Sequence, residues 1–321
     1  SSSWTLTALP LFVWMGEILF RTKLSENLFE GLSPWMQRLP WGLIHVNVVG
    51  CAIFAAISGS SAATVATVGK MSIPELRKRN YPEKILLGSL AGSGTLGLLI
   101  PPSIILIIYG VTVQESIAKL FIAGIFPGIM IAIIFMTYVV IWSLMNKNKM
   151  PVLTENIPFI EKIKKSGKLI PVILLIVSVI GSIYSGVATA TEAASLGVVG
   201  ALILSFFQKS LTVDSFKKSL LGATKTSCMI GFILAGSTFL SLAMGFTGLP
   251  RNLAIWIDKM QLSPYILIIV LMIFYIILGM FLDGISAVVL TMAIIEPMIR
   301  QAGFDMIWFG IFLVVVVEMA Q

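Results

Sequence analysis

The sequence predicts an all-α integral membrane protein built from two inverted repeats, each with a re-entrant helical hairpin and a broken transmembrane helix. Of its 321 residues, 57% are hydrophobic and 12% are charged, whereas a soluble domain carries about 25% charged residues. Two long apolar runs are interrupted near their middle by small residues, at Ser58-Gly59-Ser60-Ser61-Ala62 and Asp283-Gly284-Ile285-Ser286-Ala287. Because lipid offers no hydrogen bonds to freed backbone groups, such breaks must be buried in protein or line a cavity.

The two breaks resemble two copies of one sequence motif. Each contains Gly and small hydroxyl residues, Asp283 stands where Ser58 stands in the first, and a proline (Pro74 or Pro297) follows at the far end of the apolar run. Two broken helices at corresponding positions are the sequence signal of a secondary transporter whose binding site lies between its repeats. Transport is therefore the leading functional hypothesis.

The helices can be placed in order, because a membrane-spanning helix needs about 20 apolar residues. A first helix is predicted over 5–20, an amphipathic connector follows, and the first broken run covers 42–73. The run over 85–112 is itself interrupted at Gly94-Thr95-Leu96-Gly97 and Pro101-Pro102-Ser103. Two successive prolines remove two donors and restrict the residue before them, so a continuous helix is not expected there. Further helices are predicted over 118–145, 169–187, 193–207, 226–247, 264–282, 285–299 and 304–320.

Basic residues fall in alternate loops, which predicts the orientation in the membrane. The loops at 77–84, 147–168 and 209–225 are rich in Lys and Arg, whereas those near 113–117 and 188–192 contain neither. Lys and Arg favour the cytoplasmic side. An odd number of predicted crossings separates the two broken runs, so their openings are expected on opposite faces, as in an inverted repeat.

Four segments are expected along the chain. Residues 1–41 form a scaffold helix and the amphipathic connector, and residues 42–145 form the first repeat with its hairpin and the unwound Pro-Pro helix. Residues 146–262 form a cytoplasmic loop and scaffold helices, and residues 263–321 form the second hairpin and the helix after it. The chain begins without Met and stops within apolar sequence, so we expect a piece that is truncated at both ends.

Composition also limits the chemistry. The net charge of +7 comes mostly from loops between apolar runs, so no nucleic-acid partner is expected. His45 is the only histidine, and Cys51 and Cys228 lie far apart in apolar sequence, which predicts neither a disulfide framework nor a transition-metal site. Hard cations held by carbonyl and hydroxyl oxygens remain possible, and no other cofactor is expected.

A hairpin tip can bind ions without charged side chains. The half-helix that follows the tip presents free N–H groups to an anion, and the half-helix before it presents free carbonyls to Na⁺. Ser58, Gly59, Ser60 and Ser61, facing the unwound 94–97 backbone, are the candidate cage. The alternative is that these small residues only allow close helix packing.

Several single residues carry two interpretations. Asp283, an ionisable group inside an apolar run, either binds a cation or caps the half-helix that begins after it, and both roles are compatible. Thr189 or Thr191 is expected to cap a helix. Glu17 and Glu318 are expected to be buried hydrogen-bond partners, and His45 is more consistent with packing than with a proton relay.

Five segments, in order and over nearly the whole chain, resemble the large membrane subunit of the TRAP (tripartite ATP-independent periplasmic) transporters, within the wider ion-transporter superfamily. They are Phe54-Ala55-Ala56-Ile57-Ser58-Gly59-Ser60-Ser61-Ala62; Leu96-Gly97-Leu98-Leu99-Ile100-Pro101-Pro102-Ser103 with Tyr109-Gly110; Ala123-Gly124-Ile125-Phe126-Pro127-Gly128; Thr189-Ala190-Thr191-Glu192-Ala193-Ala194; and Leu278-Gly279-Met280-Phe281-Leu282-Asp283.

The resemblance implies an elevator-type importer in the bacterial inner membrane, driven by a Na⁺ gradient. Its partners would be a small membrane subunit and a periplasmic solute-binding protein that delivers an organic acid, such as a dicarboxylate, a sialic acid or another sugar acid. The implied Na⁺ ligands are Ser58, Gly59, Ser60, Ser61, Thr95 and Gly97 at one site and Asp283, Gly284 and Ser286 at the other. The implied substrate contacts are Ser60, Ser61, Pro102, Ser103 and Ser286.

One departure from the family affects the second site. The family carries a second Pro-Pro loop after the second hairpin, and this chain stops at Gln321, just before that loop is expected. We therefore expect the second Na⁺ site to be incomplete in this chain and the chain by itself not to transport.

Other functional classes stay open from sequence. A Na⁺/carboxylate symporter that needs no binding protein would share the hairpins, and a channel or a structural membrane subunit is less consistent with the paired breaks. An enzyme is not expected. An aspartyl intramembrane protease needs two carboxylates acting together, and only Asp283 is well placed. A serine protease needs a base near Ser60 or Ser61, and His45 is well removed along the chain.

Overall fold

The computed structural model describes residues 4–22, 24–37, 39–40, 42–146, 158–248, 252, 255 and 263–320, and every regular element within them is helical. Among the described residues, five helices are long and apolar enough to cross a membrane. They are Ile117–Met145, Phe159–Tyr184, Ala190–Phe207, Val213–Thr247 and Gly284–Gln301. The predicted all-α class with several apolar helices, consistent with a membrane protein, is confirmed.

The chain begins with η1 (Trp4–Thr7), α1 (Ala8–Phe20), α2 (Leu24–Met36), η2 (Gly42–Ile44), α3 (His45–Ser58), α4 (Ser61–Lys78), α5 (Glu83–Gly94), η3 (Thr95–Leu98), α6 (Ile104–Thr112) and α7 (Ile117–Met145). It continues with α8 (Phe159–Ser166), η5 (Gly167–Leu169), α9 (Ile170–Tyr184), α10 (Ala190–Phe207), α11 (Val213–Thr247), α13 (Pro264–Gly279), α14 (Gly284–Gln301) and α15 (Met306–Ala320). The predicted interruptions lie at the junctions α3–α4, α5–η3–α6 and α13–α14.

Two predicted basic loops are wrong in extent. The loop placed at 209–225 is helical from Val213, because Thr212 and Ser215 form a capping box that starts α11. Lys218 pairs with Asp214 one turn away at 2.6 Å, so these lysines project from a helix. The loop placed at 147–168 is helical from Phe159, where α8, η5 and α9 run on as one segment, and residues 147–157 lie outside the described part of the chain.

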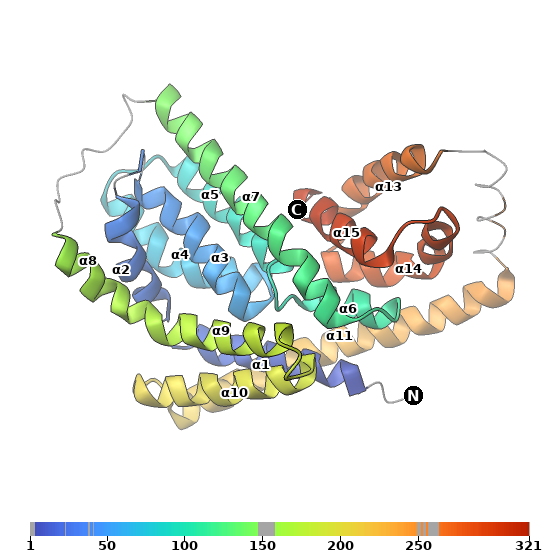
Figure 1. Ribbon diagram of the computed structural model, residues 1–321, viewed down its shortest axis with the longest axis horizontal. Helices are drawn as coiled ribbons and strands as arrows, with labels where there is room; N and C mark the ends of the chain where they lie inside the picture. Colours follow the sequence, from blue (N-terminus) through green and yellow to red (C-terminus); the bar gives the residue numbers. More distant parts are fainter. Residues whose placement is uncertain are drawn as a thin grey trace.

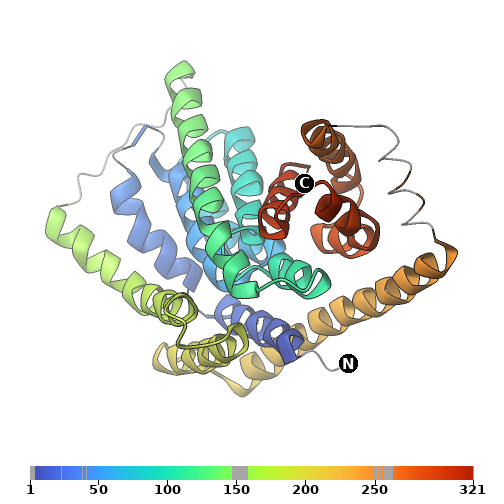
Figure 2. The ribbon, with the colours of Figure 1, turned by 45° about the vertical axis from the view of Figure 1, so that its right-hand side comes forward.

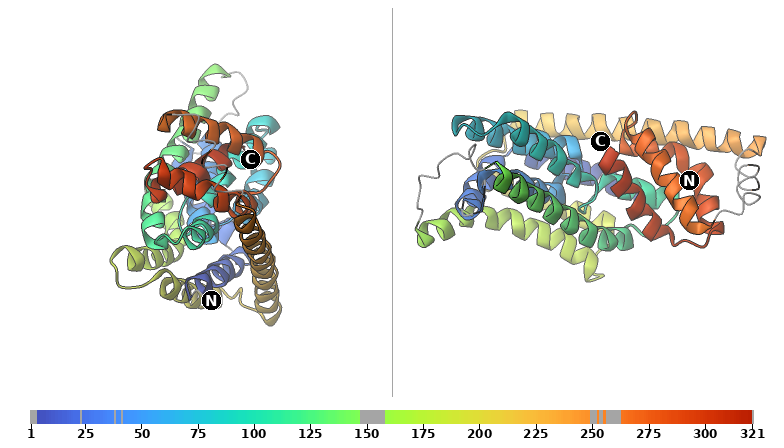
Figure 3. Two further views of the ribbon diagram at one scale, coloured as in Figure 1. Left: turned by 90° about the vertical axis from the view of Figure 1, so that its right-hand side faces the viewer. Right: turned by 90° about the horizontal axis from the view of Figure 1, so that it is seen from above.

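The helices form three groups (Figure 1). The first contains α2 to α5 with α7, the second contains α13 to α15, and α6 lies between them and contacts α7, α14 and α15. A third group, α1 with α9, α10 and α11, runs along the lower edge, and the two upper groups stay on either side in the turned view (Figure 2). The straight rod of α11 contacts α1 and also reaches α14 (Figure 3).

Small residues allow the close packing of the third group. Gly197 of α10 faces Met15 of α1, where a Cβ would collide with the sulfur. Trp14 of α1 meets Phe216 of α11 edge to face at 5.9 Å and donates from Nε1 to the Ser219 hydroxyl at 3.4 Å. The helices α1, α10 and α11 are thereby joined into one layer.

The first and second groups are connected through α6 and α15. The hydroxyl of Tyr109 in α6 donates to the carbonyl oxygen of Met306 at 2.6 Å, and both residues are buried. The Tyr109 ring fills the space where a side chain at Gly310 would lie. The α6 half of the broken helix is therefore packed tightly against the second half of the chain.

Two parts of the chain repeat their local structure in one register. Helices α4 and α14 are both 18 residues long and carry their proline, Pro74 or Pro297, at the fourteenth position. Six residues after each proline the backbone turns at a residue with positive φ, which is 59° at Asn80 and 80° at Gly303. Equivalent positions are thus 223 residues apart, the separation that also joins Thr95 to Glu318.

Backbone hydrogen bonds at the two turns match in the same register. The N–H of Tyr81 donates to the Leu76 carbonyl at 3.1 Å, and the N–H of Phe304 donates to the Ile299 carbonyl at 3.2 Å. The following helices, α5 and α15, begin at equivalent positions. This agreement extends the similarity that the sequence indicated at the breaks through a turn and into the next helix.

Candidate functional site

The first break is a tight connection between two helix ends. Gly59, at φ +60°, ends α3 by donating its N–H to the Ala55 carbonyl at 3.1 Å. Ser60 is extended and caps α4, its hydroxyl accepting from the Ala63 N–H at 3.5 Å. A left-handed residue at the end of a helix favours glycine. The predicted interruption at Ser58-Gly59-Ser60 is confirmed.

Oxygen atoms cluster behind this connection. The Ser58 hydroxyl lies 2.9 Å from that of Thr64 and 3.3 Å from the Ser60 carbonyl oxygen, to which Thr64 donates at 2.7 Å. Ser58 is 4% exposed and Thr64 is fully buried. Hydroxyl and carbonyl oxygens are the ligands that hard cations prefer. Sequence reasoning missed Thr64, although its position four residues after Ser60 places it one helical turn beyond the cap.

The 3₁₀ turn η3 and the loop after it contact the connection between α3 and α4 backbone to backbone. A Cβ on Gly97 would lie 2.7 Å from the Ser60 carbonyl carbon and 2.8 Å from the Ser61 nitrogen. A Cβ on Gly59 would collide with the Pro102 carbonyl oxygen, and the Ile104 N–H donates to the Gly59 carbonyl at 3.3 Å. Glycine at positions 59 and 97 is therefore required by close approach, which brings these two predicted site segments together.

Ser103 holds the start of α6. Its hydroxyl accepts from the Leu106 N–H at 3.3 Å and donates to the Leu98 carbonyl across the loop, whose Pro101–Pro102 bond is cis. The predicted interruption before α6 is confirmed. Ser103 is fully buried and its hydroxyl is engaged with the backbone on both sides.

Thr95 is oriented toward the second half of the chain. Its hydroxyl lies 2.7 Å from the Gly92 carbonyl oxygen and 2.8 Å from Oε1 of Glu318 in α15. Glu318 is 5% exposed, so the prediction of a buried hydrogen-bond partner is confirmed. No local pattern in the sequence indicated this particular pairing.

The second break is capped by its aspartate. Oδ2 of Asp283 accepts from the N–H groups of Ile285 and Ser286 at 3.2 Å each, and Oδ1 accepts from the Ser286 hydroxyl at 2.5 Å. The capping interpretation is confirmed. Asp283 corresponds to Ser60, the N-cap of α4, rather than to Ser58 as predicted, because both residues start an 18-residue helix.

The two sets of predicted residues lie in different packing environments. The first belongs to α3 and α4, which pack against α1, α5 and η3. The second, Asp283 with Gly284 and Ser286, belongs to the start of α14, which packs against α6, α11 and α15. Asp283 is exposed, whereas Ser58 is buried.

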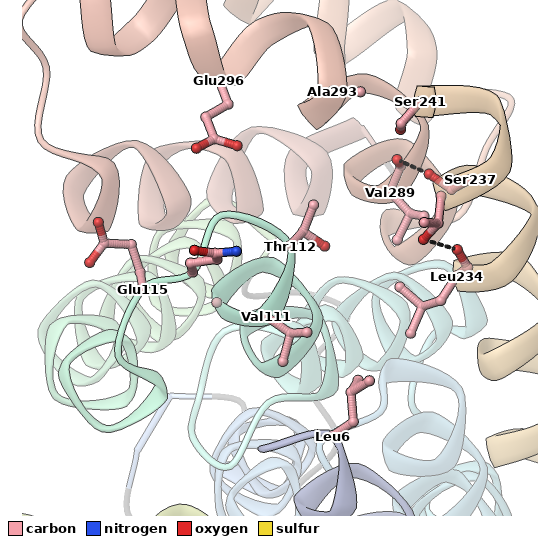
Figure 4. Close-up of a pocket in the computed structure, with 13 residues that line it drawn as sticks. Leu6, Val111, Thr112, Glu115, Leu234, Ser237, Ser241, Val289, Ala293 and Glu296 are labelled. Atoms are coloured by element: carbon pink, nitrogen blue, oxygen red, sulfur yellow. Dashed lines mark hydrogen bonds between the residues drawn. The ribbon is translucent and has the colours of Figure 1, made fainter. Parts of the chain in front are cut away.

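A cavity of about 850 Å³ lies between α6, α11 and α14 (Figure 4). Its walls combine hydroxyl groups such as Ser237, which donates to the Val289 carbonyl at 2.5 Å, with two carboxylates, Glu115 and Glu296. Arg300 pairs with Glu296 at 2.9 Å and lies 3.8 Å from Glu115. None of the predicted site residues is among its described lining residues, and two carboxylates do not favour an organic anion.

Other predicted residues have structural roles. Thr189 and Glu192 form a capping box at α10, which decides between Thr189 and Thr191 as the cap. His45 is fully buried and its Nε2 donates to the Pro40 carbonyl at 3.1 Å, which agrees with packing. Glu17, predicted to be buried, is only half-buried and pairs with Arg21 at 2.9 Å. Among the described residues, no three His, Cys, Asp or Glu side chains converge.

Comparison with known proteins identifies the relationship. Residues 1–321 match the family described as "Tripartite ATP-independent periplasmic transporter, DctM component". The C4-dicarboxylate TRAP transporter large permease protein DctM of Pseudomonas aeruginosa is 33% identical over 320 residues, covering 99% of this chain and 74% of that protein.

Two further relatives have other names. The 2,3-diketo-L-gulonate TRAP transporter large permease protein YiaN of Escherichia coli is 32% identical over 318 residues, covering 98% of this chain and 74% of that protein. The isethionate TRAP transporter permease protein DctMQ of Oleidesulfovibrio alaskensis is 31% identical over 317 residues, covering 98% of this chain and 49% of that protein.

Proposed function

The chain belongs to the DctM component family of the tripartite ATP-independent periplasmic transporters, and on this basis we propose that it imports an organic acid by Na⁺ symport. It is a transport protein rather than an enzyme. Its proposed partners are a small membrane subunit and a periplasmic solute-binding protein, and its proposed location is the bacterial inner membrane. The relatives are named for two carboxylic acids and a sulfonic acid, which supports a small organic anion as substrate.

The observation that carries the proposal is the backbone contact of the α3–α4 connection with η3 and with the loop between η3 and α6. We assign a Na⁺ site to the oxygen atoms gathered there, with Ser58, Gly59, Ser60, Ser61, Thr95 and Gly97 as candidate members. Bound Na⁺ would hold the tip against the loop, since it bridges oxygens from both. The substrate carboxylate would lie at the start of α4, where free N–H groups favour anions, with Pro102 and Ser103 as further candidate contacts.

The second proposed Na⁺ site lies at the start of α14. Asp283, Gly284 and Ser286 are its candidate members, and Ser286 is also a candidate substrate contact. The matched register of α4 and α14 supports this assignment, because two repeats with the same helix break are expected to bind the same kind of ion.

The proposed mechanism is an elevator with two re-entrant hairpins, α3–α4 and α13–α14. The moving part would comprise residues 42–145 and 263–321, and residues 1–41 and 146–262 would form the scaffold and the cytoplasmic connection. Two features support this division. The α1, α10 and α11 layer is packed through Gly197 and Trp14, and Tyr109 joins α6 to α15.

Uptake into proteoliposomes tests the function. The full-length permease would be reconstituted with its small subunit and given labelled C4-dicarboxylates, sugar acids and sulfonates, each with its binding protein. We expect accumulation of one class only when an inward Na⁺ gradient and the binding protein are both present. Na⁺-dependent uptake without the binding protein would indicate a simple symporter, and flux without accumulation would indicate a channel; either result would overturn the tripartite proposal.

The combined substitution Ser60→Ala and Ser61→Ala tests the first site. It removes two hydroxyls and the cap of α4, so we expect the Na⁺ concentration for half-maximal uptake to rise about tenfold, equivalent to about 1.4 kcal/mol. Loss of the cap lowers the free energy of unfolding by about 1 kcal/mol. Ser116→Ala, which removes the corresponding cap from α7, is the matched control. If the double variant showed the same Na⁺ dependence of uptake as Ser116→Ala, Ser60 and Ser61 would not belong to the Na⁺ site.

A further inference from the structure

Glu318 is a buried carboxylate with one satisfied oxygen and one free oxygen. It lies near the end of α15 and is 5% exposed. Oε1 accepts from the Thr95 hydroxyl at 2.8 Å, whereas Oε2 is buried without a hydrogen-bond partner. No ion pair between described residues includes it. A buried carboxylate with no cationic partner is strongly destabilising, all the more within a membrane.

The neighbouring elements do not supply a positive charge. Among the described residues of the helices packed against α15, Arg300 of α14 is engaged with Glu296 and with the Val113 carbonyl. Lys119 lies exposed in the first turn of α7. No positively charged side chain among the described residues therefore neutralises Glu318, and a cation bound at Oε2 would supply that charge.

Glu318 and its hydrogen-bond partner Thr95 occupy equivalent positions in the two repeated segments. Glu318 and Thr95 are 223 residues apart, the offset that relates Pro297 to Pro74 and Gly303 to Asn80. The two residues are thus equivalent in the repeat and contact each other. Contact between equivalent positions is what a local two-fold axis produces where it passes between two copies.

We propose that Glu318 is a cation ligand that completes the first ion site from the second half of the chain. This inference rests on the proposed function, because Thr95 belongs to that site. The cation would be bound by Oε2 of Glu318 together with oxygens near Thr95, where α5 gives way to the 3₁₀ turn η3. Carboxylate, hydroxyl and carbonyl oxygens form the ligand set of a hard cation, and Na⁺ is the ion of this class that the function supplies.

The arrangement couples the two halves. A cation between Glu318 and η3 neutralises the carboxylate and fixes α15 against the unwound helix. The segment that contacts the α3–α4 connection, which begins with η3, is then held in place by α15, the helix that follows the second break. Na⁺ binding at the first site therefore depends on the position of the second half.

Na⁺ binding by the purified permease tests the assignment. The full-length protein with its small subunit would be titrated with NaCl against choline chloride at constant ionic strength, and Na⁺-induced thermal stabilisation would report the Kd. Glu318→Gln keeps the side-chain shape and an acceptor for Thr95 but removes the charge. We expect its Kd for Na⁺ to rise at least about tenfold, with no loss of stability in choline chloride. Glu115→Gln, which removes a carboxylate on the α6–α7 turn, is expected to bind Na⁺ normally.

The outcomes separate the two proposals. One outcome is that Glu318→Gln binds Na⁺ with the wild-type Kd while the double change Ser60→Ala and Ser61→Ala weakens binding. That outcome would overturn the role of Glu318 and leave the proposed function standing. A wild-type protein that shows no Na⁺-specific stabilisation would overturn the proposed function itself. Glu318→Asp retains the charge on a shorter side chain, so it provides the measurement if the Gln variant does not fold, and weaker but measurable Na⁺ binding is expected.

Discussion

Replacing Gly59 by alanine is expected to open the first hairpin tip and to abolish Na⁺-driven uptake. Gly59 has φ +60°, a conformation that costs an L-residue about 1–2 kcal/mol. The added Cβ would also collide with the Pro102 carbonyl oxygen, which is backbone, and overpacking costs about 1–3 kcal/mol. We therefore expect the free energy of unfolding to fall by about 2–5 kcal/mol, measured by denaturant unfolding in detergent.

The chain provides a matched control for this substitution. Gly88 lies within α5, and no neighbouring atom comes within 4 Å of the position that a Cβ would take there, so Gly88→Ala should leave uptake unchanged. Its helix should gain up to about 1 kcal/mol, since alanine favours helix over glycine. A Gly59→Ala protein that is as stable and as active as Gly88→Ala would contradict the close contact between the tip and the loop.

The breaks in the helices were predictable because their causes are local. Gly59 requires no Cβ, Ser60 caps a helix, and Pro101 and Pro102 cannot continue one, so each interruption is visible in a few residues. The start of α11 was not predictable from charge. Lys217 and Lys218 suggested a loop, but a capping box at Thr212 begins the helix before them. Charge predicts the side of the membrane and not where a helix begins.

The site was predictable only in part, because its assembly depends on packing between distant segments. Composition and spacing identified the small residues at each break, and the structure packs Gly59 against Pro102 and Gly97 against Ser60. Those patterns did not identify Thr64, whose role comes from helical periodicity behind the cap. Neither did they identify the contact between Thr95 and Glu318, which no local pattern encodes. The repeat register explains this contact, and that register becomes clear only once the helix ends are fixed.

Substitutions at Asp283 are expected to separate its structural role from its proposed ionic role. Asp283→Ala removes the cap of α14 and its three hydrogen bonds, so the free energy of unfolding should fall by about 1 kcal/mol. Asp283→Asn preserves the cap, because asparagine is an equally good N-cap, and removes only the charge. In both variants we expect Na⁺-driven uptake at limiting Na⁺ to fall at least about tenfold.

The comparison between the Ala and Asn variants distinguishes a purely capping role of Asp283 from an additional role in Na⁺ binding. If Asp283 only caps α14, the Asn variant should be as active as the wild type and the Ala variant should lose stability alone. If Asp283 also binds the coupling ion, the Asn variant should be stable and weakly coupled, with uptake restored in part by a higher Na⁺ concentration. Asp305→Asn is the control, since Oδ1 of Asp305 accepts from the Trp308 N–H at 2.8 Å at the start of α15 and belongs to neither break. Because Glu318 reaches the first site from the half of the chain that also contains Asp283, a loss of Na⁺ binding at Asp283 should also weaken Na⁺ binding at the first site.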